Sequence, residues 1–174
     1  MKKRVIFTPS ELKLYGRTYF YIGEKLELKI GKDFIIRSGA TAGIDVGVGS
    51  KIVIEDGASL IIRDYSGMTN TVIQCHEHIY IGNYVNIGAE CLIMDSNFHS
   101  TNWKDRTDRK TDISRCKNAP VTIGDFVFIG TRCIICKGVK IGSRSIVAAG
   151  FVVIKDIGEG EIWGGSPARF IKKV

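Results

Sequence analysis

The sequence predicts an all-β protein, a parallel β-helix built from six-residue repeats. Three observations predict this fold: an apolar residue recurs at every sixth position, glycine often follows it, and the fifth residue of many repeats is small or branched. Because six is even, the first and fifth residues of a repeat share one face of a strand. An amphipathic helix would instead repeat its apolar stripe every three or four residues, and sandwich strands usually recur every 8–12 residues.

The first position of the repeat is apolar in three series. These series are Ile30, Ile36, Ala42, Val48, Ile54 and Leu60, then Ile81, Ile87 and Ile93, and finally Ile123, Ile129, Ile135, Ile141, Val147 and Val153. Glycine occupies the next position in 8 of these 15 repeats, whereas a chain with 20 Gly among 174 residues would place about two there. Glycine permits a tight corner where a side chain would crowd the backbone. Each repeat is therefore expected to form one short strand and one corner.

The fifth positions are expected to point into the same interior as the first positions. They are occupied by Val85, Cys91, Val127, Cys133, Val139 and Ser145. Several corners per circuit would wind the chain into a coil, and successive coils would stack through backbone hydrogen bonds at a spacing of about 4.8 Å. The repeats alone leave open the handedness of the coil and the number of its sides.

The length fits a single domain, residues 1–174. Residues 1–25 are expected to form an N-terminal cap, in which the run from Thr8 to Glu11 resembles a capping box and Gly16 ends a short helix. Two segments interrupt the period, residues 62–78 and residues 94–120. The second is predicted to be a protruding loop with a functional role, because a rigid scaffold positions its loops for binding. Residues 159–174 form a C-terminal tail, which is basic and free of acids from Ser166 onward.

Composition narrows the possible partners and compartments. No stretch approaches the roughly 18 apolar residues of a membrane-spanning helix, so membrane insertion is not expected. The charged start has no apolar stretch behind it, and five cysteines are an odd number, so reduced thiols in the cytoplasm are expected.

The Cys133 to Cys136 spacing lacks a second cysteine pair and is interpreted as structural. The net charge is +7, but the positive residues are dispersed among acids, which argues against nucleic acid. The basic tail is suited to one phosphorylated cofactor.

His99 is the candidate catalytic residue. It lies where the long loop leaves the predicted coil, just after Ile93, and a histidine can accept a proton near neutral pH. Asp95 or Asn97 could hold its other ring nitrogen. The alternative is a solvated loop histidine without a chemical role.

Two further histidines, His76 and His78, raise the question of a metal site. On a strand they would face one side and could bind a metal together with His99. No ordinary zinc-site spacing is present, so they are interpreted as exposed strand residues beside Glu77, and no metal is expected.

Three segments together resemble the hexapeptide-repeat acyltransferases, and within them the O-acetyltransferases that act on sugars and other small molecules. These segments are the Ile-Gly repeats, the run from Asp95 to His99, and the closing run from Ala119 through Gly142 to Arg169. The resemblance extends from about residue 30 to residue 174. It implies a left-handed triangular β-helix with three repeats per coil, a homotrimer with active sites between subunits, and acetyl-CoA or another acyl-CoA as the donor.

The resemblance also implies roles for individual residues. His99 matches the family's catalytic histidine and Asp95 the acid that opens its motif, while Asn97 stands where many relatives have a second acid. The positions that match coenzyme A contacts are Thr131 and Ala149 at the pantetheine arm, and Lys155 and Arg169 at the phosphates or the adenosine end.

The expected reaction is direct transfer of an acetyl group to a hydroxyl or amine of a sugar or glycan precursor. A thioester is already activated, so the enzyme must align the two substrates, remove a proton and stabilise an oxyanion. Trp103, Arg106 and Asn97 are candidate acceptor contacts and Asn70 is a weaker one, although Trp103 could equally be buried under its own loop. Two alternatives remain, a metal hydratase resembling the γ-class carbonic anhydrases and a non-catalytic β-helix scaffold.

Overall fold

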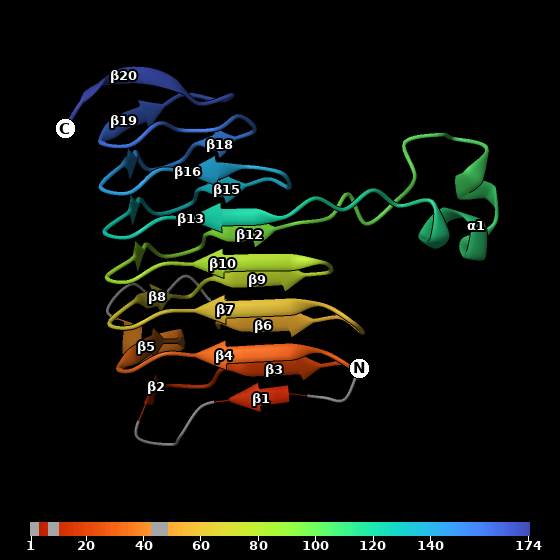
Figure 1. The fold of residues 1–174 in the computed structure, drawn as a ribbon, viewed down its shortest axis with the longest axis horizontal. Helices are drawn as coiled ribbons and strands as arrows, with labels where there is room; N and C mark the ends of the chain where they lie inside the picture. Colours follow the sequence, from red (N-terminus) through yellow and green to blue (C-terminus); the bar gives the residue numbers. More distant parts are fainter. Residues whose placement is uncertain (1–3, 7–10, 43–48) are drawn as a thin grey trace.

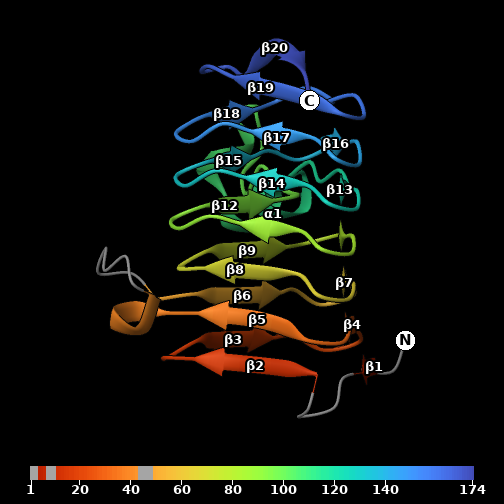
Figure 2. The same ribbon diagram turned by 90° about the vertical axis from the view of Figure 1, so that its left-hand side faces the viewer.

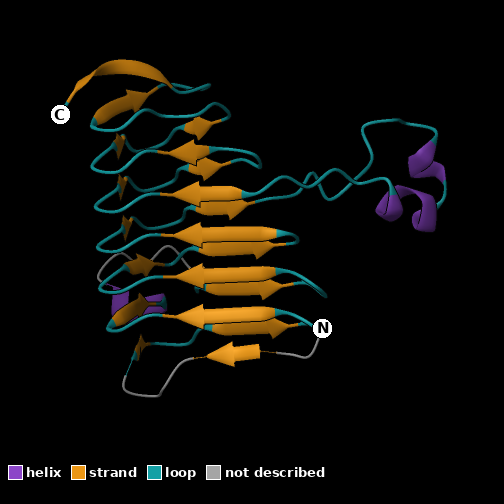
Figure 3. Ribbon diagram, viewed as in Figure 1, coloured by secondary structure: helices purple, strands orange, loops and turns teal. Residues whose placement is uncertain are grey.

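The computed structural model describes residues 4–6, 11–42 and 49–174. As predicted, these residues wind into a left-handed parallel β-helix, whose three sheets form the sides of a prism (Figure 1, Figure 3). Except for the last strand of the chain, each strand pairs in parallel with the equivalent strands of the neighbouring coils, and the chain visits the three sheets in turn.

The strands are distributed over the three sheets, which we name A, B and C. Sheet A contains β1 (Arg4–Ile6), β4 (Glu27–Ile30), β7 (Ser59–Ile62), β10 (His78–Ile81), β13 (Val121–Ile123) and β16 (Lys140–Ile141). Sheet B contains β2 (Leu12–Tyr15), β5 (Phe34–Arg37), β8 (Gly67–Thr69), β11 (Asn86–Ile87), β14 (Phe128–Ile129), β17 (Ile146–Val147), β19 (Glu161–Gly164) and β20 (Arg169–Lys173). Sheet C contains β3 (Tyr19–Ile22), β6 (Lys51–Ile54), β9 (Val72–Cys75), β12 (Leu92–Met94), β15 (Ile134–Ile135) and β18 (Val152–Val153).

The core is a column of apolar side chains inside the prism. All six predicted fifth positions are buried in it, as expected. Ser145 is the polar member of this set, and its hydroxyl donates to the carbonyl of Gly158 at 2.6 Å and accepts from the amide of Glu161 at 3.2 Å. The coil thus accommodates a buried hydroxyl because both of its hydrogen-bonding roles are satisfied.

All five cysteines are free. Cys75, Cys91 and Cys133 fill the core as small apolar residues. Cys116 and Cys136 are only half-buried and lie outside this core.

The glycines after the first positions are required by the close approach of neighbouring coils. A Cβ atom added to Gly130 would lie 2.6 Å from the amide nitrogen of Ala149, one coil further on. The positive φ angles of the corners fall on other residues, including Tyr84 at 56° and Phe126 at 58°. The rings of these two residues stack with their centroids 5.0 Å apart, which stabilises the corner between sheets A and B.

Three details of the predicted organisation are wrong. Residues 62–78 do not leave the coil, because β8, β9 and β10 continue it with a shifted repeat. The coil is instead interrupted after β5, where Ala42 lies in the 3-10 helix η1 (Gly39–Ala42), while Val48 lies outside the described residues.

The expected N-terminal helix is the third error. The capping box falls partly on residues 8–10, outside the described part of the chain, and residues 12–15 form strand β2, which pairs in parallel with β5. Leu12 and Leu14 are separated by Lys13, and this alternation suits a strand better than one turn of helix. The segment 1–25 therefore supplies strands of the β-helix itself.

Two further segments complete the fold. The loop 94–120 leaves the prism between β12 and β13, as predicted, and its two arms pair through an antiparallel bridge between Ser96 and Asn118 (Figure 1). Its tip contains η2 (Asp105–Thr107) and α1 (Arg109–Ser114). At the C-terminus, β20 runs antiparallel to β19, so the tail covers the last coil (Figure 2). Within the described residues, no helix has the length and apolarity needed to cross a membrane.

Candidate active site

His99 lies on the outgoing arm of the loop, and a carboxylate fixes its ring. Its Nδ1 atom lies 2.6 Å from Oδ2 of Asp112, while 68% of its side chain is exposed. Because a carboxylate accepts a hydrogen bond from the protonated Nδ1, the lone pair of the neutral imidazole is left on Nε2. This is the tautomer that a general base requires.

Asp112 is positioned by the short helix α1. The side chain of Asp108 caps the N-terminus of this helix by accepting from the amide of Thr111 at 2.8 Å. Asp112 then reaches back to the outgoing arm, where its Oδ1 accepts from the amide of Ser100 at 2.7 Å. The hydrogen bond from His99, and then the one from Ser100, lower the pKa of Asp112 below its usual range.

The orienting acid differs from the expected one. Asp95 is fully buried, and its carboxylate accepts hydrogen bonds from the backbone amides of residues 76, 77 and 78 at 2.7–2.8 Å. Asn97 joins the two arms of the loop, since its amide donates to the carbonyl of Lys117 at 3.1 Å. Asp112 therefore takes the position beside the imidazole that was expected for Asp95 or Asn97.

A cavity of about 800 Å³ opens beside His99, between the loop and the prism. Its walls come from the turns after β6 and β9, both arms of the loop and α1. The lining residues are Glu55, Asp56, His76, Phe98, His99, Arg109, Asp112, Ile113, Cys116 and Asn118. The cavity therefore combines apolar surface with side chains of both charge signs, and it is large enough for a small-molecule acceptor.

The predicted acceptor contacts do not line this cavity. Trp103 is 65% exposed at the tip of the loop, so the alternative of a buried tryptophan is also wrong. Arg106 donates to the carbonyl of Ser100 at 2.7 Å and so stabilises the loop. Asn70 is buried, and its side chain accepts from the amide of Gly39, next to the interruption after β5.

The structure separates the three histidines. His76 and His99 line the same cavity, but His78 does not. Within residues 11–42 and 49–174, no group of three or more His, Cys, Asp or Glu side chains is arranged to hold a metal ion. The pair does not share a strand face, because His76 lies in the turn that precedes β10, where His78 begins the strand.

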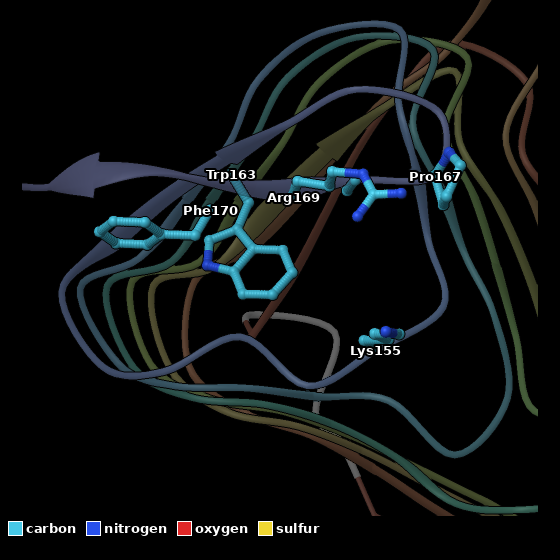
Figure 4. A pocket seen from close by; sticks show the side chains of 6 residues that line it. Lys155, Trp163, Pro167, Arg169 and Phe170 are labelled. Carbon is cyan, nitrogen blue, oxygen red and sulfur yellow. The ribbon is translucent and has the colours of Figure 1, made fainter.

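A second pocket, of about 340 Å³, lies at the C-terminal end of the prism and includes two of the predicted coenzyme contacts. Lys155 and Arg169 line it together with Trp163, Pro167, Ala168 and Phe170 (Figure 4). The indole of Trp163 is fixed by Glu161, which accepts from its Nε1 at 2.8 Å. Two cations beside aromatic rings are suited to a phosphorylated nucleotide, since the cations bind phosphate and the rings can stack on a base.

The other two predicted coenzyme contacts lie at a different corner of the prism. Thr131 follows β14 and Ala149 follows β17, so both are at the corner between sheets B and C. They occupy equivalent places on successive coils, where the amide of Gly150 donates to the carbonyl of Thr131 at 2.8 Å. Both side chains are exposed, which leaves this corner accessible. The loop with His99 leaves the prism at another corner, between sheets C and A.

Comparisons with known proteins agree with this architecture. A family model described as the hexapeptide repeat of succinyl-transferase matches residues 120–155. A maltose O-acetyltransferase from Clostridium difficile is 26% identical, with a TM-score of 0.65, over 84% of this chain and 69% of that one. A hexapeptide-repeat acetyltransferase from Vibrio cholerae, solved with acetyl coenzyme A, is 27% identical, with a TM-score of 0.57, over 87% of this chain and 69% of that one. The chain thus carries the hexapeptide repeat over residues 120–155 and has the fold of hexapeptide-repeat acetyltransferases.

The curated relatives of this chain match over a short stretch. A 2,3,4,5-tetrahydropyridine-2,6-dicarboxylate N-acetyltransferase of Clostridium perfringens is 49% identical over 55 residues, which are 32% of this chain and 23% of that protein. The chain thus spans about a quarter of the length of that relative. One of these named relatives transfers to oxygen and another to nitrogen, so the family alone does not determine the acceptor atom.

Proposed function

We propose that this protein is an acetyltransferase that moves an acetyl group from acetyl-CoA to a hydroxyl, or an amine, of a sugar or glycan precursor. The observation that supports this most directly is the hydrogen bond between His99 and Asp112 at the wall of an open cavity. It leaves Nε2 of His99 as a proton acceptor in a space that a small molecule can enter. The five free cysteines suit a reducing compartment, and we expect the cytoplasm.

The proposed reaction is direct transfer in a ternary complex. Nε2 of His99 removes the proton of the acceptor hydroxyl as its oxygen forms a bond to the acetyl carbon. The carbon–sulfur bond of the thioester then breaks, and His99 returns the proton to the departing thiolate. During these steps the charge of Asp112 stabilises the imidazolium and holds the ring in place.

Acetyl-CoA fits the residues at the C-terminal end and supplies the activated thioester when it is bound. Lys155 and Arg169 would bind its phosphates, with Trp163 and Phe170 beside them. The backbone groups of Thr131 and Ala149 would bind the pantetheine arm. The Vibrio cholerae structure with acetyl coenzyme A supports this choice of donor.

We further propose that the protein works as a homotrimer with its active sites between subunits. In one chain, His99 projects from the corner between sheets C and A, whereas Thr131 and Ala149 lie at the corner between sheets B and C. A neighbouring copy that brings its corner between sheets B and C to this loop would complete the site. Cyclic symmetry would then generate three equivalent sites.

Replacement of His99 by alanine tests the proposed base. Turnover should fall by about 10²–10⁴-fold, because a positioned general base contributes that much, while acetyl-CoA binding should remain unchanged. The measurements are thiol release from acetyl-CoA with a panel of acceptors, including maltose and glucosamine, and calorimetric titration with coenzyme A. His78→Gln is the matched control, since His78 lies outside the cavity. Equal turnover in His99→Ala and the wild type would contradict the assigned role.

A further inference from the structure

The cavity beside His99 contains a second pair of polar side chains, Glu55 and His76, on adjacent coils of the prism. Strands β6 and β9 pair in parallel with Ile54 opposite Cys75, so the next residues of the two strands are also in register. The amide of Glu55 donates to the carbonyl of Cys75 at 2.9 Å, which continues this register into the turns. The two backbones are therefore separated by about 4.8 Å at this point.

Both side chains point outward from the prism into the same space. Ile54 and Cys75 are buried in the core, and side-chain directions alternate along a strand, so Glu55 and His76 face away from it. Both residues line the cavity that includes His99. A carboxylate and an imidazole thus lie side by side within reach of the same small molecule.

The chain holds His76 firmly although the proposed reaction does not use it. The amide of His76 donates to Oδ1 of the buried Asp95 at 2.7 Å, and the imidazole packs edge-to-face on Phe98 with their centroids 5.1 Å apart. Phe98 is the residue before His99, so this contact links the two histidines. A ring fixed on its backbone and on one neighbour loses little further entropy when it binds a ligand.

The polar side-chain atoms of Glu55 and His76 have no hydrogen-bond partners in the described part of the chain. No hydrogen bond or ion pair engages the carboxylate of Glu55 or the ring nitrogens of His76 there. By contrast, Asp112 is bonded to His99 and Ser100, and Asp56 accepts from the amide of Glu24. Glu55 and His76 therefore have hydrogen-bonding capacity available for a ligand.

We infer that Glu55 and His76 bind the acceptor and determine its class, a neutral polyhydroxyl compound such as a sugar. Adjacent hydroxyl groups on a ring can donate together to one carboxylate, and a neutral imidazole can accept from or donate to a third hydroxyl. The carboxylates of Glu55 and Asp56 disfavour a phosphate or carboxylate group of the acceptor at this wall. This inference rests on the proposed acetyl transfer and specifies its acceptor.

The test compares steady-state kinetics of Glu55→Gln and His76→Gln with the wild type, using maltose and glucose as acceptors and thiol release as the readout. Each variant should raise the acceptor KM by about tenfold or more, because a charge-assisted or buried-site hydrogen bond is lost. The kcat at saturating acceptor and the KM for acetyl-CoA should stay within about twofold. Glu77→Gln is the matched control, since it removes the same charge from a neighbouring residue outside the cavity.

The outcomes separate this inference from the proposed function. An acceptor KM that is unchanged in both variants, with an active wild type, overturns the inference and leaves acetyl transfer intact. A lower kcat at unchanged KM also overturns it, because the residues would then act on His99 rather than on the acceptor. A wild type that releases no thiol with any sugar overturns both. Thermal melting and titration with coenzyme A show that each variant is folded.

Discussion

The pairing of His99 with Asp112 makes the order of the loop sensitive to acid. The hydrogen bond from His99 lowers the pKa of Asp112. A carboxylate whose pKa is lower in the folded state stabilises the protein above its unfolded pKa of about 3.9, and this stabilisation is lost as the pH falls through the folded value. We therefore expect Asp112→Asn to melt at a lower temperature than the wild type at pH 7, with the difference shrinking below about pH 4.

The same substitution should slow turnover by about tenfold to a hundredfold at neutral pH. Asparagine can still accept a hydrogen bond from Nδ1, but it provides no charge to stabilise the imidazolium. The exposure of His99 keeps the effect below that of a buried catalytic triad. Glu77→Gln, which removes a carboxylate outside the cavity, is the control. A melting difference that is constant from pH 7 to pH 3 would show that Asp112 acts through its shape alone.

His99 could be predicted from the sequence, whereas its partner could not. The histidine follows the last residue of a regular repeat, so its place at the base of the loop was evident. Asp112 is 13 residues further along, and only the folding of α1 brings it back to the ring. The cap at Asp108 is the one local signal for that helix, and a six-residue helix gives too little periodicity to be identified. The repeat pattern therefore does not predict contacts within the loop, such as the one between His99 and Asp112.

The cost of replacing a glycine that follows a first position should depend on how close the backbone of the neighbouring coil lies. In Gly130→Ala the new methyl group would meet the backbone of Ala149, which cannot rotate away as a side chain can. We expect a loss of about 1–3 kcal/mol in the free energy of unfolding, as is typical of overpacking. Gly67→Ala is the matched control, because its Cβ would have an ordinary 3.4 Å contact with the carbonyl of Ile35. Urea denaturation measures both, and equal stability of the two variants would contradict the spacing argument.

The strands were predictable because the repeat is a physical consequence of stacking. Each inward position meets its equivalent in the coils above and below, so the same apolar type recurs. The pattern failed where an apolar residue matched the period by coincidence, as Ala42 did in η1. It also failed at residues 62–78, where a shifted repeat looked like a break although the backbone pairing continued. In both cases the six-residue spacing alone does not show whether the backbone pairs with the neighbouring coils.

The sides of the prism determine how the proposed trimer must assemble. The loop with His99 projects from the corner between sheets C and A, whereas Thr131 and Ala149 lie at the corner between sheets B and C. A site that uses both therefore needs two copies of the chain. The arms of the loop carry helix α1 away from the coils of its own chain (Figure 1). This separation suits a loop that reaches a neighbour, and it makes the contribution of each copy testable independently.

Mixed oligomers test whether two chains share each site. His99→Ala removes the base, and Ala149→Glu places a charged side chain on the exposed corner proposed for pantetheine; each variant alone should be nearly inactive. Co-expression of the two in equal amounts should restore about one quarter of the wild-type activity in the unfractionated mixture, because half the loops and half the corners are intact and they combine at random in a cyclic trimer. Purified trimers that contain both variants should have about one third of the wild-type activity, because one of their three sites is intact. Separately tagged chains purified together confirm the mixing, and sedimentation gives the mass. Activity that stays at the level of the single variants in verified mixed trimers would place the whole site within one chain.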